Sequence, residues 1–395
     1  MLSVEILRGR VVTPGAVLED GVVEIDGDRL VAVRPAATDD PPTEADQWLL
    51  PGLVDLHNHG GGGASFTVPD PEQVAVAAAH HLARGTTTLL GSAVTDSPER
   101  MLAVTATLAD AVDTGALAGI HLEGPFLAES CKGAQDARYL RGPDPGLTAE
   151  LIAAGRGQVK VMTLAAELPG ADAVADLLLA EGVVVALGHT AADATTARRF
   201  LGSRARLVTH LFNGMPPMHH RSPGPALAAL AAAGTGAAWV ELVADGVHLA
   251  DETIRAALSI AGPRSVFVTD AMAAAGMPDG DYVLGPQRVT VAEGVARLTE
   301  GGAIAGGTSS LLDQVRRHAT AGLDPVTLAH AAATSPAAVV GLGDVGALAP
   351  GLRADVVIAD ADLAPVRVMR AGVWVEESGH VGGEDQRPVR PAGRR

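Results

Sequence analysis

The sequence predicts an α/β fold, a (β/α)8 barrel of the TIM type joined to a small β domain that both chain ends build. Two observations predict the barrel: eight apolar, β-branched runs recur between residues 53 and 269, and helix-like segments separate them. Continuous apolar strands that alternate with helices indicate a parallel sheet buried on both faces. Eight such units favour a closed barrel, with an open doubly wound sheet as the alternative.

The predicted barrel elements alternate along the chain. The strands are 53–56, 86–90, 118–122, 159–164, 183–187, 206–209, 238–243 and 265–269, and helices are predicted at 71–84, 98–112, 171–181, 191–201 and 251–261. Pro71 and Pro98 suit the first turn of a helix, where no amide hydrogen bond is needed, and Asp70 and Ser97 before them are expected N-caps.

The two chain ends contain short strand-like runs. These are 4–7, 10–12, 22–25, 30–33 and 48–50 near the N-terminus, and 354–358, 366–369 and 373–376 near the C-terminus. The turn Asp26-Gly27-Asp28 indicates a hairpin. Neither end has enough strands to bury its own core, so we expect residues 1–50 and 345–380 to form one small β-sandwich domain around a barrel of residues 51–344. Residues 381–395, rich in Gly, Pro and Arg, are expected to be disordered.

Composition excludes several classes of function. The net charge of −17 argues against non-specific nucleic-acid binding, because the field of the protein repels phosphates. The single cysteine, Cys131, excludes an intramolecular disulfide and fits a reducing cytoplasm. We find no signal-peptide pattern and no uncharged apolar run of about 18 residues, so we expect a soluble, cytoplasmic protein without a membrane span.

Ionisable side chains follow five of the predicted strands. They are His57 and His59 after the first strand, Glu123 after the third, His189 after the fifth, His210 after the sixth and Asp270 after the eighth. In barrel enzymes the active site lies at this end of the strands. A strand has a period of two, so His57 and His59 point to the same side, and histidines with a carboxylate are the ligands that zinc prefers.

Each of these residues alone has an ordinary structural explanation. A single histidine beside a strand is usually a core or surface residue with satisfied hydrogen bonds, and we interpret His80, His81 and His330 in this way. Six ionisable residues at one end of five strands are hard to explain by chance, so we favour a metal site. The glycines at 60–63 are not followed by a Lys-Ser/Thr pair, so a nucleotide site is weakly supported.

Several segments resemble a known family. Residues 51–59 (PGLVDLHNH) resemble the first metal-binding strand of the amidohydrolase superfamily, and residues 346–355 (GALAPGLRAD) resemble its return to the small β domain. More narrowly, HLEGPF at 121–126, LGHT at 187–190, THLFNGMP at 209–216, ADGVH at 244–248 and VTDA at 268–271 resemble the N-acetylglucosamine-6-phosphate deacetylase family. The resemblance runs from about residue 4 to 376.

The resemblance implies roles for individual residues. Glu123, His189 and His210 match the main metal ligands, His57 and His59 match a second set found in some members, and Asp270 matches the catalytic acid/base. One or two divalent ions per subunit are implied, with zinc expected and Fe, Mn, Co or Cd as alternatives. Implied substrate-binding residues are Ala134, Gln135, Asn213, Gly214, Arg221, Asp245, His248, Ile304, Ala305 and Gly306. In this family the neighbouring subunit also approaches the substrate phosphate, which implies a homodimer with a shared active site.

The implied function is hydrolysis of the acetamide of N-acetylglucosamine 6-phosphate. Gln135 departs from the family, which commonly has a histidine there that contacts the acetamide, and Gly214 replaces a usual alanine. The alternatives are therefore another N-acylhexosamine phosphate, such as N-acetylgalactosamine 6-phosphate, or another amidohydrolase such as a ring amidase or aminoacylase. A catalytically inactive metal-binding regulator should lack Asp270, and a Ser/His/Asp hydrolase would need a G-x-S-x-G motif, which is absent.

Overall fold

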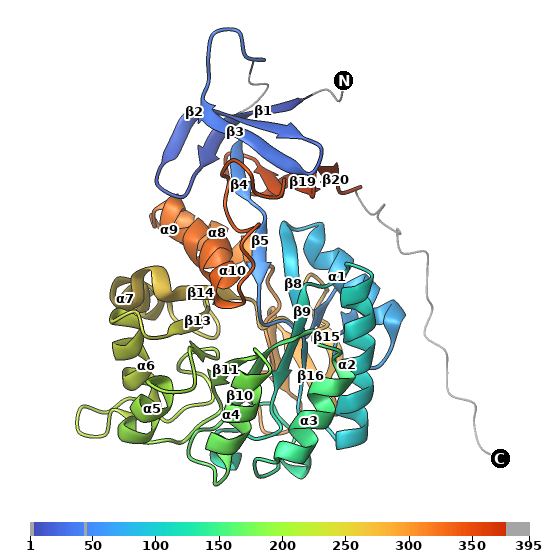
Figure 1. Ribbon diagram of the computed structural model, residues 1–395, viewed down its shortest axis with the longest axis vertical. Helices are drawn as coiled ribbons and strands as arrows, with labels where there is room; N and C mark the ends of the chain where they lie inside the picture. The colour runs from blue at the N-terminus through green and yellow to red at the C-terminus, as the bar shows by residue number, and fades with distance from the viewer. Residues whose placement is uncertain (1–3, 43–45, 377–395) are drawn as a thin grey trace, which may run out of the picture.

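The computed structural model describes residues 4–42 and 46–376, and shows a barrel domain with a smaller β domain at one end (Figure 1). The predicted disordered tail at 381–395 lies outside the described residues, as do positions 377–380 of the predicted β domain.

Eight parallel strands form the central sheet. In spatial order they are β5 (Leu53–Asp55), β8 (Thr86–Ala93), β9 (Gly119–Glu123), β10 (Val159–Leu164), β11 (Val184–Leu187), β12 (Leu207–Val208), β13 (Trp239–Val243) and β14 (Ser265–Val268). Each strand pairs in parallel with the next along the chain. All eight predicted strands are confirmed, with ends shifted by at most three residues.

The sheet closes where the last strand meets the first. The Asp270 amide donates to the carbonyl of His57 at 2.9 Å, and the His59 amide donates to the carbonyl of Ala271 at 2.7 Å. Asn58 and Ala271 form a parallel bridge at this seam. These bonds confirm the barrel and exclude the open sheet. The seam therefore lies at the end of the strands where the predicted site residues gather.

Helices surround the sheet (Figure 1). They are α1 (Pro71–Leu82), α2 (Pro98–Asp113), α3 (Pro145–Ala154), α4 (Ala171–Ala180), α5 (Ala194–Leu201), α6 (Gly224–Gly234), α7 (Asp251–Ala261), α8 (Leu311–Thr320), α9 (Pro325–Ala329) and α10 (Ser335–Val339), with single turns at Glu129–Cys131, Ala137–Tyr139, Gly262–Arg264 and His330–Thr334. Asp70 accepts hydrogen bonds from two amides of the first turn of α1, and Ser97 accepts one from α2, so both N-caps are confirmed.

The two chain ends share one seven-stranded sheet. Its order is β20 (Val373–Trp374), β19 (Pro365–Arg370), β18 (Val356–Ala359), β4 (Trp48–Pro51), β1 (Glu5–Val12), β2 (Val17–Asp26) and β3 (Arg29–Pro35). The antiparallel pair β4–β18 joins the halves. Val23, Leu30, Ile358 and Met369 belong to one buried cluster, and the Leu30 amide donates to the carbonyl of Leu352. The predicted sandwich is thus one sheet that curves until its halves face each other.

A three-stranded antiparallel sheet was not predicted. It consists of β15 (Gly280–Leu284), β16 (Gln287–Ala292) and β17 (Val295–Leu298) and follows the last barrel strand. Its buried face packs on Met272 and Ala305. A short hairpin of β6 (Gly60–Gly61) and β7 (Ala64–Ser65) follows the first barrel strand.

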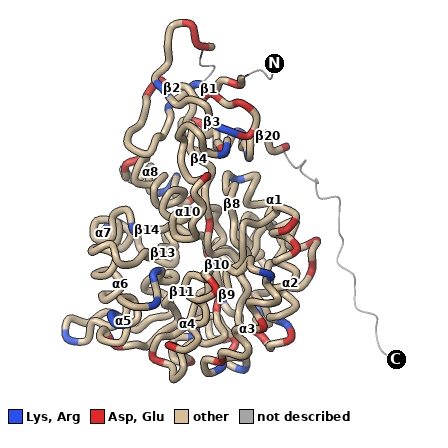
Figure 2. Tube along the Cα trace, in the orientation of Figure 1, with Lys and Arg blue, Asp and Glu red and all other residues tan. Residues whose placement is uncertain are grey.

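Charged residues are spread along the outer helices and loops (Figure 2). Several form surface ion pairs, such as Arg199–Asp172 and Arg204–Asp176, both at 2.8 Å. Among the described residues no helix is long and apolar enough to cross a membrane.

His81 links α1 to the end of the first barrel strand. It is fully buried, and its Nε2 lies 2.9 Å from the carbonyl oxygen of Gly60. Burial lowers the pKa of His81 to about 4. The structure therefore agrees with the interpretation of His81 as a core histidine, because its neutral ring is buried and hydrogen-bonded to the backbone. The unfolded chain takes up a proton below about pH 6.5, whereas the folded chain does so only near pH 4.

We therefore predict that protonation of the unfolded chain at this residue removes about 2 kcal/mol of the free energy of unfolding between pH 7 and pH 5. Urea unfolding of the metal-free wild type and of metal-free His81→Asn at both pH values measures this contribution as the difference between the two proteins. His81→Asn should show a smaller loss than the wild type, and His220→Asn, which changes an exposed histidine, should match the wild type. An equal pH dependence in His81→Asn and the wild type would contradict the assignment.

Candidate functional site

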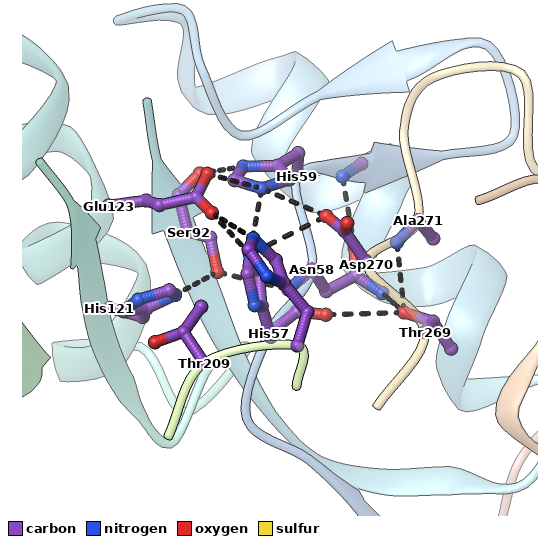
Figure 3. Close-up of polar contacts among 12 residues, drawn as sticks. His57, Asn58, His59, Ser92, His121, Glu123, Thr209, Thr269, Asp270 and Ala271 are labelled. Carbon is purple, nitrogen blue, oxygen red and sulfur yellow. Dashed lines mark hydrogen bonds and ion pairs between the residues drawn. The ribbon is translucent and has the colours of Figure 1, made fainter. Parts of the chain in front are cut away.

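The six predicted ionisable residues meet at the carboxyl ends of the barrel strands. Figure 3 shows His57 and His59 facing Glu123 on one side and Asp270 on the other. All six side chains are buried, and only Asp270, with 9% of its surface exposed, reaches the margin of solvent access. Their convergence, which the strand ends predicted, is confirmed.

Glu123 and two histidines form one group of three. Glu123 Oε1 lies 3.0 Å from Nε2 of His189 and 3.0 Å from Nε2 of His210. The two histidine nitrogens are themselves 3.0 Å apart. Three ligand atoms of the right types therefore surround one point.

Glu123 also belongs to a second group, with His57 and His59. The Nε2 atoms of these histidines lie 3.0 Å apart. His57 Nε2 is 3.4 Å from Glu123 Oε1, and His59 Nε2 is 3.3 Å from Glu123 Oε2. One carboxylate thus stands between two pairs of histidines.

Asp270 lies on the open side of the second group. Its Oδ1 is 3.3 Å from His59 Nε2, and its Oδ2 is 3.7 Å from His248 Nε2. Asp270, His189 and His210 all have a positive φ, of 46°, 46° and 26°. Strained backbone of this kind concentrates at functional sites, because the surrounding structure must hold it there.

The outer nitrogen of three of these histidines has a hydrogen-bond acceptor. His57 Nδ1 lies 3.2 Å from Glu241 Oε2, His59 Nδ1 is 3.1 Å from the carbonyl of Ser92, and His189 Nδ1 is 2.8 Å from the carbonyl of Cys131. A neutral histidine that donates from Nδ1 carries a lone pair on Nε2. The contacts therefore direct all three lone pairs toward Glu123.

Charge attraction dominates the electrostatics of the group. Burial opposes the charged form of His57, but the carboxylates of Asp270 and Glu123 outweigh it and raise the pKa of that histidine well above its usual value. His59 is also buried, yet hydrogen bonds to Asp270 and Glu123 raise its pKa to about 9. Burial opposes ionisation of Glu123 and Asp270, but the histidines hold both pKa values below their ordinary range.

The residues fit a divalent metal. Two sets, His57/His59/Glu123 and Glu123/His189/His210, each offer three ligand atoms within 4.8 Å of one another. Nitrogen and carboxylate oxygen are the donors expected for zinc and similar ions, and a set of three leaves a coordination position for water or substrate. The metal site inferred from the sequence therefore has the ligand atoms that it needs.

A cavity of about 320 Å³ opens beside these residues. Of the predicted substrate-binding residues, Ala134, Gln135, Asn213, Gly214, His248, Ile304 and Gly306 line it. Phe212 and Leu284, which the sequence did not indicate, line it as well. Leu284 comes from β15, so the unpredicted three-stranded sheet forms part of the wall.

Three predicted substrate-binding residues do not line the cavity. Asp245 instead holds His248, accepting from its Nδ1 at 2.8 Å. Ala305 is buried against the β15–β17 sheet. Arg221 is exposed on the loop after β12, where its guanidinium lies 2.8 Å from Nε2 of His220. In a single chain Arg221 therefore stands away from the cavity.

Gln135 contacts the carboxylate of Glu123. Its Nε2 donates to Glu123 Oε2 at 2.6 Å, and its Oε1 accepts from the amide of Thr95 at 2.9 Å. The resemblance implies a contact with the acetamide at this position. The side chain does line the cavity, but both of its polar atoms already have protein partners.

Glu241 is the main site residue that sequence reasoning missed. It lies within β13, is 1% exposed, and contacts His57 and the backbone amide of His210. An acidic residue in an otherwise apolar predicted strand was a usable signal, since unpaired charges are rarely buried without a role.

Comparison with known proteins agrees with this geometry. The model of the amidohydrolase family matches residues 48–376. A solved structure of an aspartate-to-alanine variant of N-acetyl-D-glucosamine-6-phosphate deacetylase from Mycobacterium smegmatis, in complex with N-acetyl-D-glucosamine-6-phosphate, superposes with a TM-score of 0.90. It is 40% identical and covers 94% of this chain and 99% of its own.

Two curated relatives extend the comparison. N-acetylgalactosamine-6-phosphate deacetylase from Escherichia coli O157:H7 is 34% identical over 91% of this chain and 96% of its own length. N-acetylglucosamine-6-phosphate deacetylase from Mus musculus is 32% identical over 84% of this chain and 85% of its own length. The chain therefore belongs to the amidohydrolase family and, within it, to the deacetylases that include N-acetylglucosamine-6-phosphate deacetylase.

Proposed function

We propose that this protein hydrolyses the acetamide of N-acetylglucosamine 6-phosphate to glucosamine 6-phosphate and acetate, as a step in the use of amino sugars. One observation carries the proposal: Asp270, a buried carboxylate, lies at a cavity beside two histidine–carboxylate sets that share Glu123. Structural relatives named for this reaction support the choice of substrate.

The ligand sets define how a metal would contribute. Glu123, His189 and His210 would hold one divalent ion, and His57, His59 and Glu123 a second, with zinc favoured by the nitrogen-rich donors and Fe, Mn, Co or Cd as alternatives. A bound ion of this kind lowers the pKa of water to about 7 and polarises a carbonyl.

Asp270 is assigned the proton transfers. Its Oδ atoms reach both the histidine cluster and the cavity, so a water attacking the acetamide carbon from the cluster can pass its proton to this carboxylate. The protonated Asp270 then delivers the same proton to the amide nitrogen as the C–N bond breaks. The products are acetic acid and the amine, and the remaining water proton passes from the acid to the amine, so that acetate and an ammonium group leave while Asp270 returns to its ionised form.

The phosphate group needs local cations, because the chain carries a net charge of −17. Asn213 and His248 line the cavity, and Asp245 fixes the ring of His248. We assign Arg221 to the phosphate in a homodimer, in which the exposed loop of one subunit reaches the cavity of the other. Sedimentation equilibrium tests this assembly, and a monomer at assay concentrations would contradict the shared site.

N-acetylgalactosamine 6-phosphate is the second candidate substrate, because one relative carries that name. Three solved structures that share 30–41% identity over 94% of the chain are named for the glucosamine sugar, which favours N-acetylglucosamine 6-phosphate. We also propose that the enzyme acts in the cytoplasm, because its single cysteine excludes an intramolecular disulfide and fits a reducing compartment.

The proposed function predicts a substrate preference. N-acetylglucosamine 6-phosphate should give a higher kcat/KM than N-acetylgalactosamine 6-phosphate. It should exceed unphosphorylated N-acetylglucosamine by at least about tenfold, since a charge-assisted hydrogen bond is worth roughly 1.5–3 kcal/mol. Mass spectrometry of the products, with metal content measured on the same sample, provides the assay. A higher rate with the galactosamine sugar would overturn the preferred substrate.

Arg221→Ala isolates the phosphate contribution. It should raise KM for the phosphorylated sugar and leave kcat/KM for the unphosphorylated sugar unchanged. Arg199→Ala is the matched control, because Arg199 is an exposed arginine paired with Asp172. Equal losses on both sugars would remove Arg221 from the phosphate site.

The proposed role of Asp270 predicts the effect of removing its carboxylate. Asp270→Asn keeps the shape of the side chain but cannot accept and return a proton, so kcat should fall by roughly 10²–10⁴-fold with metal content unchanged. A fall of less than about tenfold would transfer the role to another group, for which the candidate is His248, a cavity residue outside both ligand sets with its Nε2 3.7 Å from Asp270. Loss of metal in this variant would identify Asp270 as a ligand instead.

The two ligand sets predict the metal stoichiometry. The metal-saturated wild type should hold two ions per chain, and the double variant His57→Ala/His59→Ala should hold one, bound by Glu123, His189 and His210. Elemental analysis after gel filtration measures both. A wild type that holds a single ion, retained in the double variant, would show that the second site does not exist.

A further inference from the structure

Glu241 is a buried carboxylate that the proposed reaction does not use. It lies in β13 with 1% of its surface exposed. Among the described residues no lysine or arginine forms an ion pair with it, and its Oε1 has no hydrogen-bond partner. An ionised side chain in this position is costly to bury, so its retention calls for a specific task.

The contacts of Glu241 join the two metal sets. Its Oε2 lies 3.2 Å from His57 Nδ1 and accepts from the backbone amide of His210 at 3.1 Å. The rings of His57 and His210 are stacked, with centroids 5.4 Å apart. A single carboxylate oxygen therefore fixes the ring of one ligand and the backbone of another.

His57 differs from the other ligands in what supports it. His59 and His189 are supported by neutral backbone carbonyls, whereas His57 has a carboxylate behind it. An acceptor at Nδ1 holds the proton there and keeps the lone pair on Nε2, the atom that faces His59 and Glu123.

We propose that Glu241 is a positioning residue that sets the orientation and tautomer of His57, and thereby the affinity of the His57/His59/Glu123 set for its ion. The inference rests on the proposed two-ion function. Glu241 does not touch the substrate cavity, so its influence on turnover passes through the ion that His57 binds.

The test compares side chains of similar size at position 241. Glu241→Leu and Glu241→Met cannot accept a hydrogen bond, whereas Glu241→Gln can still accept from His57 and His210 through its amide oxygen. Zinc affinity of each equivalent is measured by competition with a chromophoric chelator, and the Co²⁺-substituted proteins give absorption spectra of each set. Thermal unfolding of the metal-free variants shows whether each one is folded.

In Glu241→Leu and Glu241→Met, one zinc equivalent should weaken by roughly 10–100-fold, the usual effect of removing such a support, while the other is retained. Glu241→Gln should stay within about threefold of the wild type, as expected when geometry rather than charge is decisive. The cobalt spectrum should change only in the component that His57→Ala also removes.

A double variant shows which ligand transmits the effect. In a His57→Ala background, Glu241→Leu should not weaken the remaining ion further. A further loss would mean that Glu241 acts through His210 and would overturn the inference. Two ions of wild-type affinity in Glu241→Leu, or equal losses in the Gln and Leu variants, would also overturn it. A single ion in the wild type would instead refute the two-ion proposal, and with it this inference.

Discussion

The shared carboxylate of Glu123 is the contact on which the site depends. Its Oε1 lies 3.0 Å from His189 and His210, and its Oε2 faces His59 and accepts from Gln135. Because Glu123 belongs to both ligand sets, any displacement of its carboxylate alters both. Gln135 fixes the carboxylate and is itself fixed by the amide of Thr95, which follows β8.

The hydrogen bonds that close the barrel also hold residues of the candidate site. The seam between β14 and β5 is bridged by Asp55, which accepts from the hydroxyl of Thr269 at 2.6 Å and from Asn58 Nδ2 at 3.1 Å. Asn58 lies between the ligands His57 and His59, and Thr269 precedes Asp270. The bonds that close the barrel therefore also set the spacing between two metal ligands and the proposed proton carrier, so these groups cannot move independently.

The sequence predicted the elements whose pattern is local. Eight apolar runs form strands. The ionisable residues at their ends converge because all strands of a closed parallel sheet end on the same side of the barrel. The helix α6 was not predicted, since its alanine-rich sequence lacks a polar face that would mark a period. The β15–β17 sheet was missed because its short, partly exposed strands resemble an irregular loop.

The limits of prediction at the site have a similar cause. Gln135 could be recognised as unusual, but its bonds to Glu123 and Thr95 depend on the segment after β9 folding back onto the end of that strand and onto the loop after β8. Glu241 is separated from His57 by almost half the chain, and no local pattern connects them. The position of Arg221 outside the cavity depends on the conformation of a loop, which strand and helix periodicity do not determine.

The carboxylates of this cluster need positive charge close to them. Glu123, Asp270 and Glu241 place three carboxylates within reach of His57, either directly or through the metal set. Without metal, protons compensate this charge, which is why the pKa values of His57 and His59 are raised. A divalent ion on each ligand set would replace those protons, since histidine binds a metal only in its neutral form. The carboxylates that raise the histidine pKa values in the metal-free cluster would thus nearly neutralise the charge of two bound divalent ions. Asp270, at the cavity, is the carboxylate placed to exchange a proton with substrate.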